Sequence, residues 1–145
     1  MHSKLVRFTA VAVLVLLEAS CQTASGPRLD DVLSHQAQWN AHGLSSYSFD
    51  YTLRAMIYSV GCPTASWHLT VQQNSVAAAT CLATDSAVTP PSVTIDTLFA
   101  QVMRALSEKR ISAIAYDAQW GFPTSIEFAG PPDAAYSEAA TNLAP

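Results

Sequence analysis

The side chains in this sequence that could take part in catalysis form two pairs of titratable residues. Asp50 and His68 stand at polar positions of two neighbouring predicted strands, and with a serine they would form a hydrolase triad. Asp117 and Glu127 could serve as the acid and base of a glycosidase, although turn capping and solvation explain both carboxylates more simply. The chain contains no Gly-x-Ser-x-Gly elbow, no His-Glu-x-x-His and no glycine-rich phosphate loop. We therefore predict a noncatalytic protein and keep a hydrolase of unrecognised type as an alternative.

The cysteines form an odd set of three, Cys21, Cys62 and Cys81. In an oxidising compartment this set is accounted for if Cys21 carries a lipid and Cys62 pairs with Cys81. The alternative is a zinc site, but two cysteines with His68 between them match no recognised ligand spacing. We therefore predict a disulfide between Cys62 and Cys81, no metal site and no cofactor.

The start of the chain has the pattern of a secretory signal peptide. Lys4 and Arg7 are followed by an apolar run from Phe8 to Leu17. A helix of about ten residues is about 15 Å long, which is half the thickness of a bilayer core. We predict that residues 1–20 are a signal peptide and not a membrane span.

The segment Glu18-Ala-Ser-Cys21 resembles the bacterial lipobox, in which small residues precede the cysteine that becomes lipidated. Glu18 departs from that pattern, which has an aliphatic residue three positions before the cysteine. The resemblance implies lipidation of Cys21, and Gln22 favours an outer-membrane destination; secretion without lipid is the alternative. Residues 21–28 would then be a tether between the lipid and the domain.

The composition predicts one acidic domain. The chain has 145 residues, of which 50% are hydrophobic, with 7 Lys and Arg against 11 Asp and Glu. Without the signal peptide, about 125 residues remain, enough for a single core. The absence of a basic patch excludes nucleic acid as an expected partner.

The first half of the domain is predicted to be a helix followed by a meander of three strands. The helix spans about Leu29 to Ala41, with its apolar side formed by Leu29, Val32, Leu33 and Trp39, and Gly43 ends it; His35 and His42 are expected on the solvated side. The first strand runs from Tyr47 to Ile57, where apolar and polar residues alternate. Its aromatic face is expected in the core, with a carbohydrate-binding platform as the alternative. Strands around Trp67–Val71 and Val76–Leu82 follow, with a turn at Asn74 that places Cys81 opposite Trp67.

The second half is predicted to be a helix and a hairpin. Thr94 caps a helix from about Ile95 to Glu108. The hairpin joins Ile111–Tyr116 to a strand ending at Phe128. Its turn is a possible binding loop, or else a lid folded over the sheet edge, and consists of Asp117, Trp120, Gly121, Phe122 and Pro123.

These elements predict an α+β domain over residues 29–133. We expect an antiparallel sheet of about five strands, a meander plus a C-terminal hairpin, packed against two helices in the order α-β-β-β-α-β-β. Residues 134–145 are rich in alanine and follow Gly130-Pro-Pro, which indicates a flexible tail.

Two motifs resemble a known family. Thr94-Ile-Asp-Thr-Leu98-Phe99 and Tyr116-Asp117-x-x-x-Gly121-Phe122-Pro123-x-x-Ile126 are similar to domain-of-unknown-function family six-one-seven-four, which groups bacterial secreted or lipid-anchored domains. The chain has Asn74-Ser75 where that family often has an Asx-Gly turn. The resemblance implies the fold and a periplasmic or outer-membrane location, and it implies no reaction. We expect a noncatalytic binding or assembly module with an envelope protein as partner, or alternatively an inhibitor of a periplasmic enzyme.

Overall fold

The computed structural model describes residues 26–55, 61–131 and 135–145. The predicted signal peptide and the lipidation site Cys21 lie outside the described residues. The elements follow in the order α1 (Leu29–Ala41), β1 (Tyr47–Arg54), β2 (Ser66–Gln72), β3 (Ser75–Cys81), β4 (Ser86–Ala87), α2 (Ile95–Ser107), β5 (Ile111–Tyr116), β6 (Pro123–Phe128) and β7 (Tyr136–Ala144). Within the described residues, no helix is long and apolar enough to cross a membrane.

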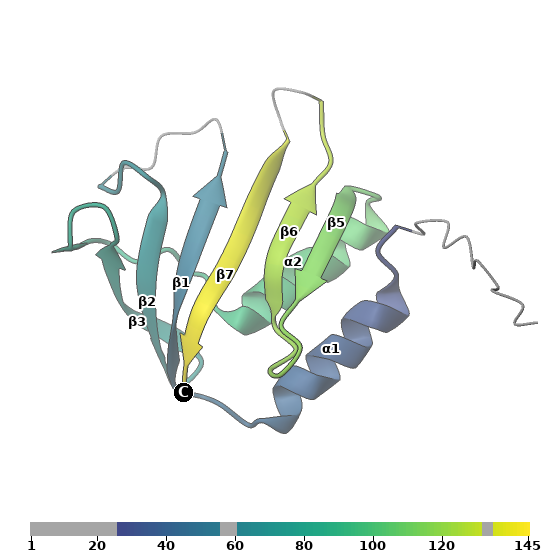
Figure 1. Ribbon diagram of the computed structural model, residues 1–145, viewed down its shortest axis with the longest axis horizontal. Helices are drawn as coiled ribbons and strands as arrows, with labels where there is room; N and C mark the ends of the chain where they lie inside the picture. The colour runs from purple at the N-terminus through teal and green to yellow at the C-terminus, as the bar shows by residue number, and fades with distance from the viewer. Residues whose placement is uncertain (1–25, 56–60, 132–134) are drawn as a thin grey trace, which may run out of the picture.

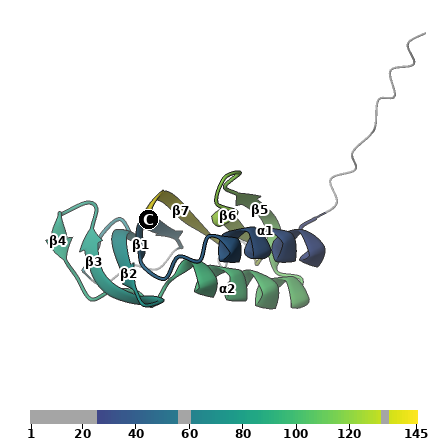
Figure 2. The ribbon, with the colours of Figure 1, turned by 90° about the horizontal axis from the view of Figure 1, so that it is seen from below.

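All strands belong to one antiparallel sheet of seven strands in the order β4-β3-β2-β1-β7-β6-β5 (Figure 1). The helix α2 lies behind the β5–β6 half of the sheet, and α1 runs alongside α2 (Figure 2). The predicted α+β class, the two helices and the antiparallel sheet are confirmed. The expected number of about five strands is wrong, because β4 and β7 were not predicted.

The strand β7 occupies the segment that was predicted to be a flexible tail. It pairs with β1 on one side and with β6 on the other, so it joins the meander to the hairpin. Ala140 lies opposite Tyr51 and is fully buried. Alanine has a low strand propensity, and here two flanking strands and burial override that propensity. The predicted domain end at residue 133 is therefore corrected, because the fold continues through β7.

The meander has the predicted register. Trp67 lies opposite Cys81, and Gln72 lies opposite Ser75. The two residues between them, Gln73 and Asn74, both have positive φ, at 51° and 59°. This is the backbone of a type I′ hairpin turn, which the sequence achieves without the usual glycine.

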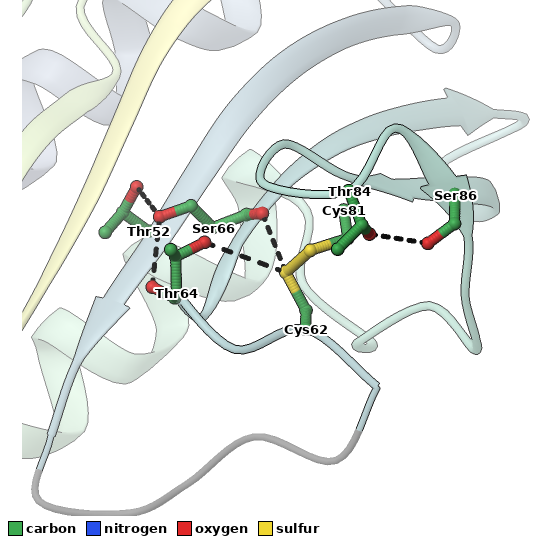
Figure 3. The surroundings of a disulfide bond; sticks show 7 residues. All are labelled: Thr52, Cys62, Thr64, Ser66, Cys81, Thr84 and Ser86. Atoms are coloured by element: carbon green, nitrogen blue, oxygen red, sulfur yellow. Dashed lines mark hydrogen bonds between the residues drawn. A yellow bond between two sulfur atoms is a disulfide. The ribbon is translucent and has the colours of Figure 1, made fainter.

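The predicted disulfide between Cys62 and Cys81 is present (Figure 3). Cys62 lies in the segment that enters β2, and Cys81 ends β3, so the bridge closes one end of the meander. Both cysteines are fully buried, and the Cys62 sulfur lies 3.1 Å from the Ser66 carbonyl oxygen.

The helices are held together at their ends. Thr94 caps α2 and forms a reciprocal capping box with Thr97. Trp39 of α1 donates a hydrogen bond from Nε1 to Asp96 in the first turn of α2, at 3.1 Å.

The predicted apolar side of α1 is only partly right, because Val32 and Trp39 are buried whereas Leu29 and Leu33 are 52% and 45% exposed. The helix rests on α2 and on the β5–β6 turn, and this contact leaves the side with the two leucines uncovered.

Candidate functional site

The face of the sheet that is turned away from the helices carries mainly small side chains. Along β1 and β2 the buried residues alternate with residues on this face, and the strand register extends the pattern across the sheet. In Figure 1 this face is turned toward the viewer, since α2 lies behind the sheet. We call it the open face, and it consists of Ser48, Asp50, Thr52, Arg54, Ser66, His68, Thr70, Ala78, Thr80, Ala113, Ala115, Ser125, Glu127, Ser137, Ala139 and Thr141.

A hydrogen-bonded cluster of three polar side chains lies on the open face. His68 Nδ1 lies 2.7 Å from Asp50 Oδ1, and Asn142 Nδ2 donates to Asp50 Oδ2 at 2.7 Å. The Asp50 side chain is 18% exposed and the His68 side chain is 44% exposed. Both carboxylate oxygens of Asp50 are therefore engaged, and the imidazole of His68 has a fixed orientation.

The position of Asn142 depends on an irregularity in β7. The pairing of β1 with β7 shifts register between Ser48 and Asp50, and Asn142 has a φ of 52° in the left-handed region. Asparagine tolerates this backbone better than most residues, and bulges of this kind redirect side chains. The alternation of the strands pairs Asp50 with His68 but does not predict Asn142, because residues 134–145 have the composition of a tail.

Among the described residues, His68 Nδ1 has a hydrogen-bond partner and Nε2 has none. If Nδ1 donates its hydrogen to Asp50, the neutral imidazole presents the Nε2 lone pair outward, as in a general base or a hydrogen-bond acceptor. Thr80 is the cross-strand neighbour of His68. Among the hydrogen bonds of the described residues, none joins a serine or threonine hydroxyl to His68, so the structure brings together two members of the proposed triad and not a third.

The other carboxylate pair is not brought together. Asp117 caps the β5–β6 turn by accepting hydrogen bonds from the backbone N–H groups of Gln119 and Trp120, at 2.8 and 2.7 Å. Glu127 lies opposite Ala113, in the part of the hairpin that is distant from the β5–β6 turn. Asp117 is four positions along the chain from Ala113, which corresponds to about 13 Å of strand. The strand thus keeps the two backbone positions apart, and the Asp117 carboxylate is engaged in capping the turn.

The possible binding loop is folded onto α1. Gln38 Nε2 donates to the carbonyl oxygens of Ala118 and Gln119, each at 3.0 Å. The backbone at Gly121 approaches α1 so closely that a Cβ atom would lie 2.7 Å from the His35 carbonyl oxygen. Phe122 and Pro123 are buried. The loop therefore has the geometry of a lid and not of an exposed tip.

The side chains at the rim of this lid are also in contact with α1. Trp120 is half-buried, and its ring centroid lies 4.5 Å from that of His42. The expectation that His35 is a solvated residue is wrong, because its ring stacks on Tyr116 with 3.9 Å between centroids. Local sequence patterns do not reveal this contact, because Tyr116 lies 81 positions further along the chain.

The comparisons with known proteins give one result. A family model described as a family of unknown function, DUF6174, matches residues 31–144. The chain belongs to this family. No curated protein and no solved structure matches the chain. The matched region includes β7, so the DUF6174 domain extends beyond the predicted boundary at residue 133.

Among the described residues of the DUF6174 domain, one carboxyl group is buried on the helix-covered side of the sheet. Glu138 of β7 is 5% exposed, and its Oε2 atom has no hydrogen-bond partner among the described residues. Burial raises the pKa of Glu138 from 4.5 to about 7, and a hydrogen bond with Tyr51 opposes this shift in part. Burial likewise raises the pKa of the Tyr51 hydroxyl. The described residues contain no cluster of three or more His, Cys, Asp or Glu side chains that could hold a metal ion.

We predict that Glu138 makes the stability of the domain fall as the pH rises. Between pH 4.5 and about 7 the folded state keeps the proton on Glu138 and the unfolded state loses it, so the free energy of unfolding decreases in this interval. The free energy of unfolding should fall by at most about 1.4 kcal/mol per pH unit. Urea unfolding of wild type and Glu138→Gln across this range measures the effect, and the variant should show a flatter profile. Parallel profiles for the two proteins would show that Glu138 is not the titrating group.

Proposed function

We propose that this DUF6174 chain is an exported, noncatalytic binding module of the bacterial cell envelope. In this proposal it recognises an envelope protein through the open face, and the lipid on Cys21 holds it at the membrane. The observation that carries the proposal is the Asn142–Asp50–His68 cluster, which fixes an imidazole on a sheet face of small side chains. Such a face lets a partner surface approach the sheet closely, and the oriented imidazole adds a specific polar contact.

Export is supported by the cysteines. A bridge between Cys62 and Cys81 persists in oxidising compartments such as the periplasm and is rare in the cytosol. The apolar run from Phe8 to Leu17 supports the same location. Expression of the full chain, followed by mass spectrometry, tests this part. We expect loss of residues 1–20 and a diacylglycerol-modified Cys21; an intact leader with reduced cysteines would contradict it.

The binding role is tested by photocrosslinking on the open face. We expect a crosslinkable amino acid at Thr141 to trap one stoichiometric envelope protein, because Thr141 is exposed and pairs with Asp50. The same amino acid at Ala100, which is exposed on α2, serves as the matched control and should trap none. Introducing His68→Ala into the Thr141 protein should lower the yield about tenfold if the imidazole contributes one good polar contact. Equal yields from Thr141 and Ala100 would contradict the use of the open face.

The hydrolase alternative rests on the same cluster, because a carboxylate that orients an imidazole at 2.7 Å is also found in nucleophilic catalysis. A nitrophenyl ester series distinguishes the two functions. The binding module should hydrolyse these esters at the same rate with and without His68→Ala. A burst of nitrophenolate that requires both His68 and Asp50 would favour the hydrolase.

A further inference from the structure

The strand β5 is an edge strand whose outer side is unpaired in the part of the chain that the structure describes. It is the last strand of the sheet and pairs only with β6 there. Its six residues, Ile-Ser-Ala-Ile-Ala-Tyr, include no charge and no proline. Proteins commonly protect sheet edges with charges, prolines or very short strands, and the opposite edge follows this rule because β4 has two residues.

The backbone of β5 is available for a further strand. Alternate residues of an antiparallel edge strand direct their N–H and C=O groups away from the neighbouring strand. The pairing with β6 shifts register near each end of β5 and is regular from Ala113 to Ala115. In this regular stretch Ala113, Ile114 and Ala115 lie opposite Glu127, Ile126 and Ser125. Unpaired backbone groups of this kind bind an added strand by main-chain hydrogen bonds.

A groove lies beside the first half of this edge strand. A cavity of about 460 Å³ lies between β5 and the start of α1, and Gly26, Pro27, Arg28, Asp31, Ser112, Ala113 and Ile114 line it. Ile114 is half-buried and provides an apolar wall. The charged residues of the groove, Arg28 and Asp31, have opposite signs, so the lining has no net charge.

These features favour an extended peptide over a second copy of this chain. A strand of six residues is about 20 Å long, and the spacing between strands is about 4.8 Å. A contact limited to this edge would cover on the order of 100 Å² of each partner, whereas stable complexes of globular proteins bury about 800 Å² on each side. A single peptide strand does not need that area, because it would contact Ser112, Ala113 and Ile114 on one side and residues 26–28 with Asp31 on the other.

We propose that the groove between α1 and β5 binds an uncharged, extended peptide segment of a partner protein as an eighth strand of the sheet. The side chains of the bound segment that point toward the helices contact Ile114, which selects small and aliphatic residues. This site adjoins the open face at Ala113, but it does not include the Asn142–Asp50–His68 cluster and does not rest on the proposed function.

The test uses a synthetic probe, acetyl-Thr-Val-Thr-Val-Thr-Val-amide, and the purified ¹⁵N-labelled protein. We expect saturable shifts of amide resonances confined to residues 112–116 and 26–31. The same peptide with every backbone nitrogen methylated should cause none of these shifts, because it has no N–H donors. The absence of shifts at millimolar peptide, or shifts elsewhere on the sheet, would overturn the proposal.

Two variants separate edge binding from loss of folding. Ile114→Pro removes a donor of the edge and risks unfolding, so its folded state is checked by circular dichroism. Ala113→Lys is at an exposed position and should fold normally, while its charge should weaken peptide binding about tenfold. Ala100→Lys, at an exposed position of α2 outside both proposed binding surfaces, is the control and should bind as wild type does. A dimer that forms without peptide and is abolished by Ala113→Lys would assign the edge to a second copy and overturn the proposal.

Discussion

Deletion of residues 135–145 is expected to abolish the folded state of this domain. The deletion removes β7, which lies between β1 and β6 and carries the buried residues Glu138 and Ala140. Without it, the meander and the hairpin each lose their only shared neighbour in the described sheet, and the apolar faces of both are exposed. We expect the far-ultraviolet circular dichroism of a disordered chain and no cooperative transition in urea.

The control for this deletion is removal of Pro145 alone. This residue is exposed and lies beyond the end of β7, so its loss should change the free energy of unfolding by less than about 0.5 kcal/mol. A folded, cooperative protein after deletion of residues 135–145 would show that β7 is dispensable.

Replacement of both Cys62 and Cys81 by alanine is expected to lower the free energy of unfolding by about 3 kcal/mol. The bridge closes a loop of 19 positions, and in the chain-entropy account its loss gives the unfolded state more conformations. This is a large fraction of the stability of a small domain, about 5 to 15 kcal/mol. Urea unfolding of the oxidised wild type and of the double variant measures the difference.

Reduction of the wild-type protein separates the bridge from the packing of the two sulfur atoms. Both cysteines are fully buried, so alanine substitution also removes apolar volume from the core. The reduced wild type keeps that volume and should still lose most of the 3 kcal/mol, about the value that chain entropy assigns to the bridge. The double variant should not respond to reductant, and equal stability of oxidised and reduced wild type would contradict a stabilising role of the bridge.

The elements with strong local signals could be predicted from the sequence. The helix Leu29–Ala41 has the predicted bounds, and the alternation in Tyr47, Phe49 and Tyr51 identified a strand with a buried aromatic face. The turn at Asn74 fixed the register, and with it the nearness of Cys81 to the segment that contains Cys62. In these cases propensity, periodicity and turn chemistry agree with one another.

The remainder depends on contacts that are distant in the chain. The segment of β7 has the composition of a tail, and only the unpaired edges of β1 and β6 make it a strand. For the same reason, only part of the candidate site could be predicted from the sequence. Asp50 and His68 could be placed on neighbouring strands from their alternation, whereas Asn142 reaches Asp50 across 92 positions and through a bulge that periodicity does not reveal.

The central place of β7 also determines when folding can be completed. This strand comes after the other described strands in the chain. The meander and the hairpin can therefore form during synthesis before β7 pairs with both of them. Pairings between distant segments form slowly, because a long loop must close before they contribute stability. A chain with this topology therefore has no complete sheet until residues 136–144 emerge.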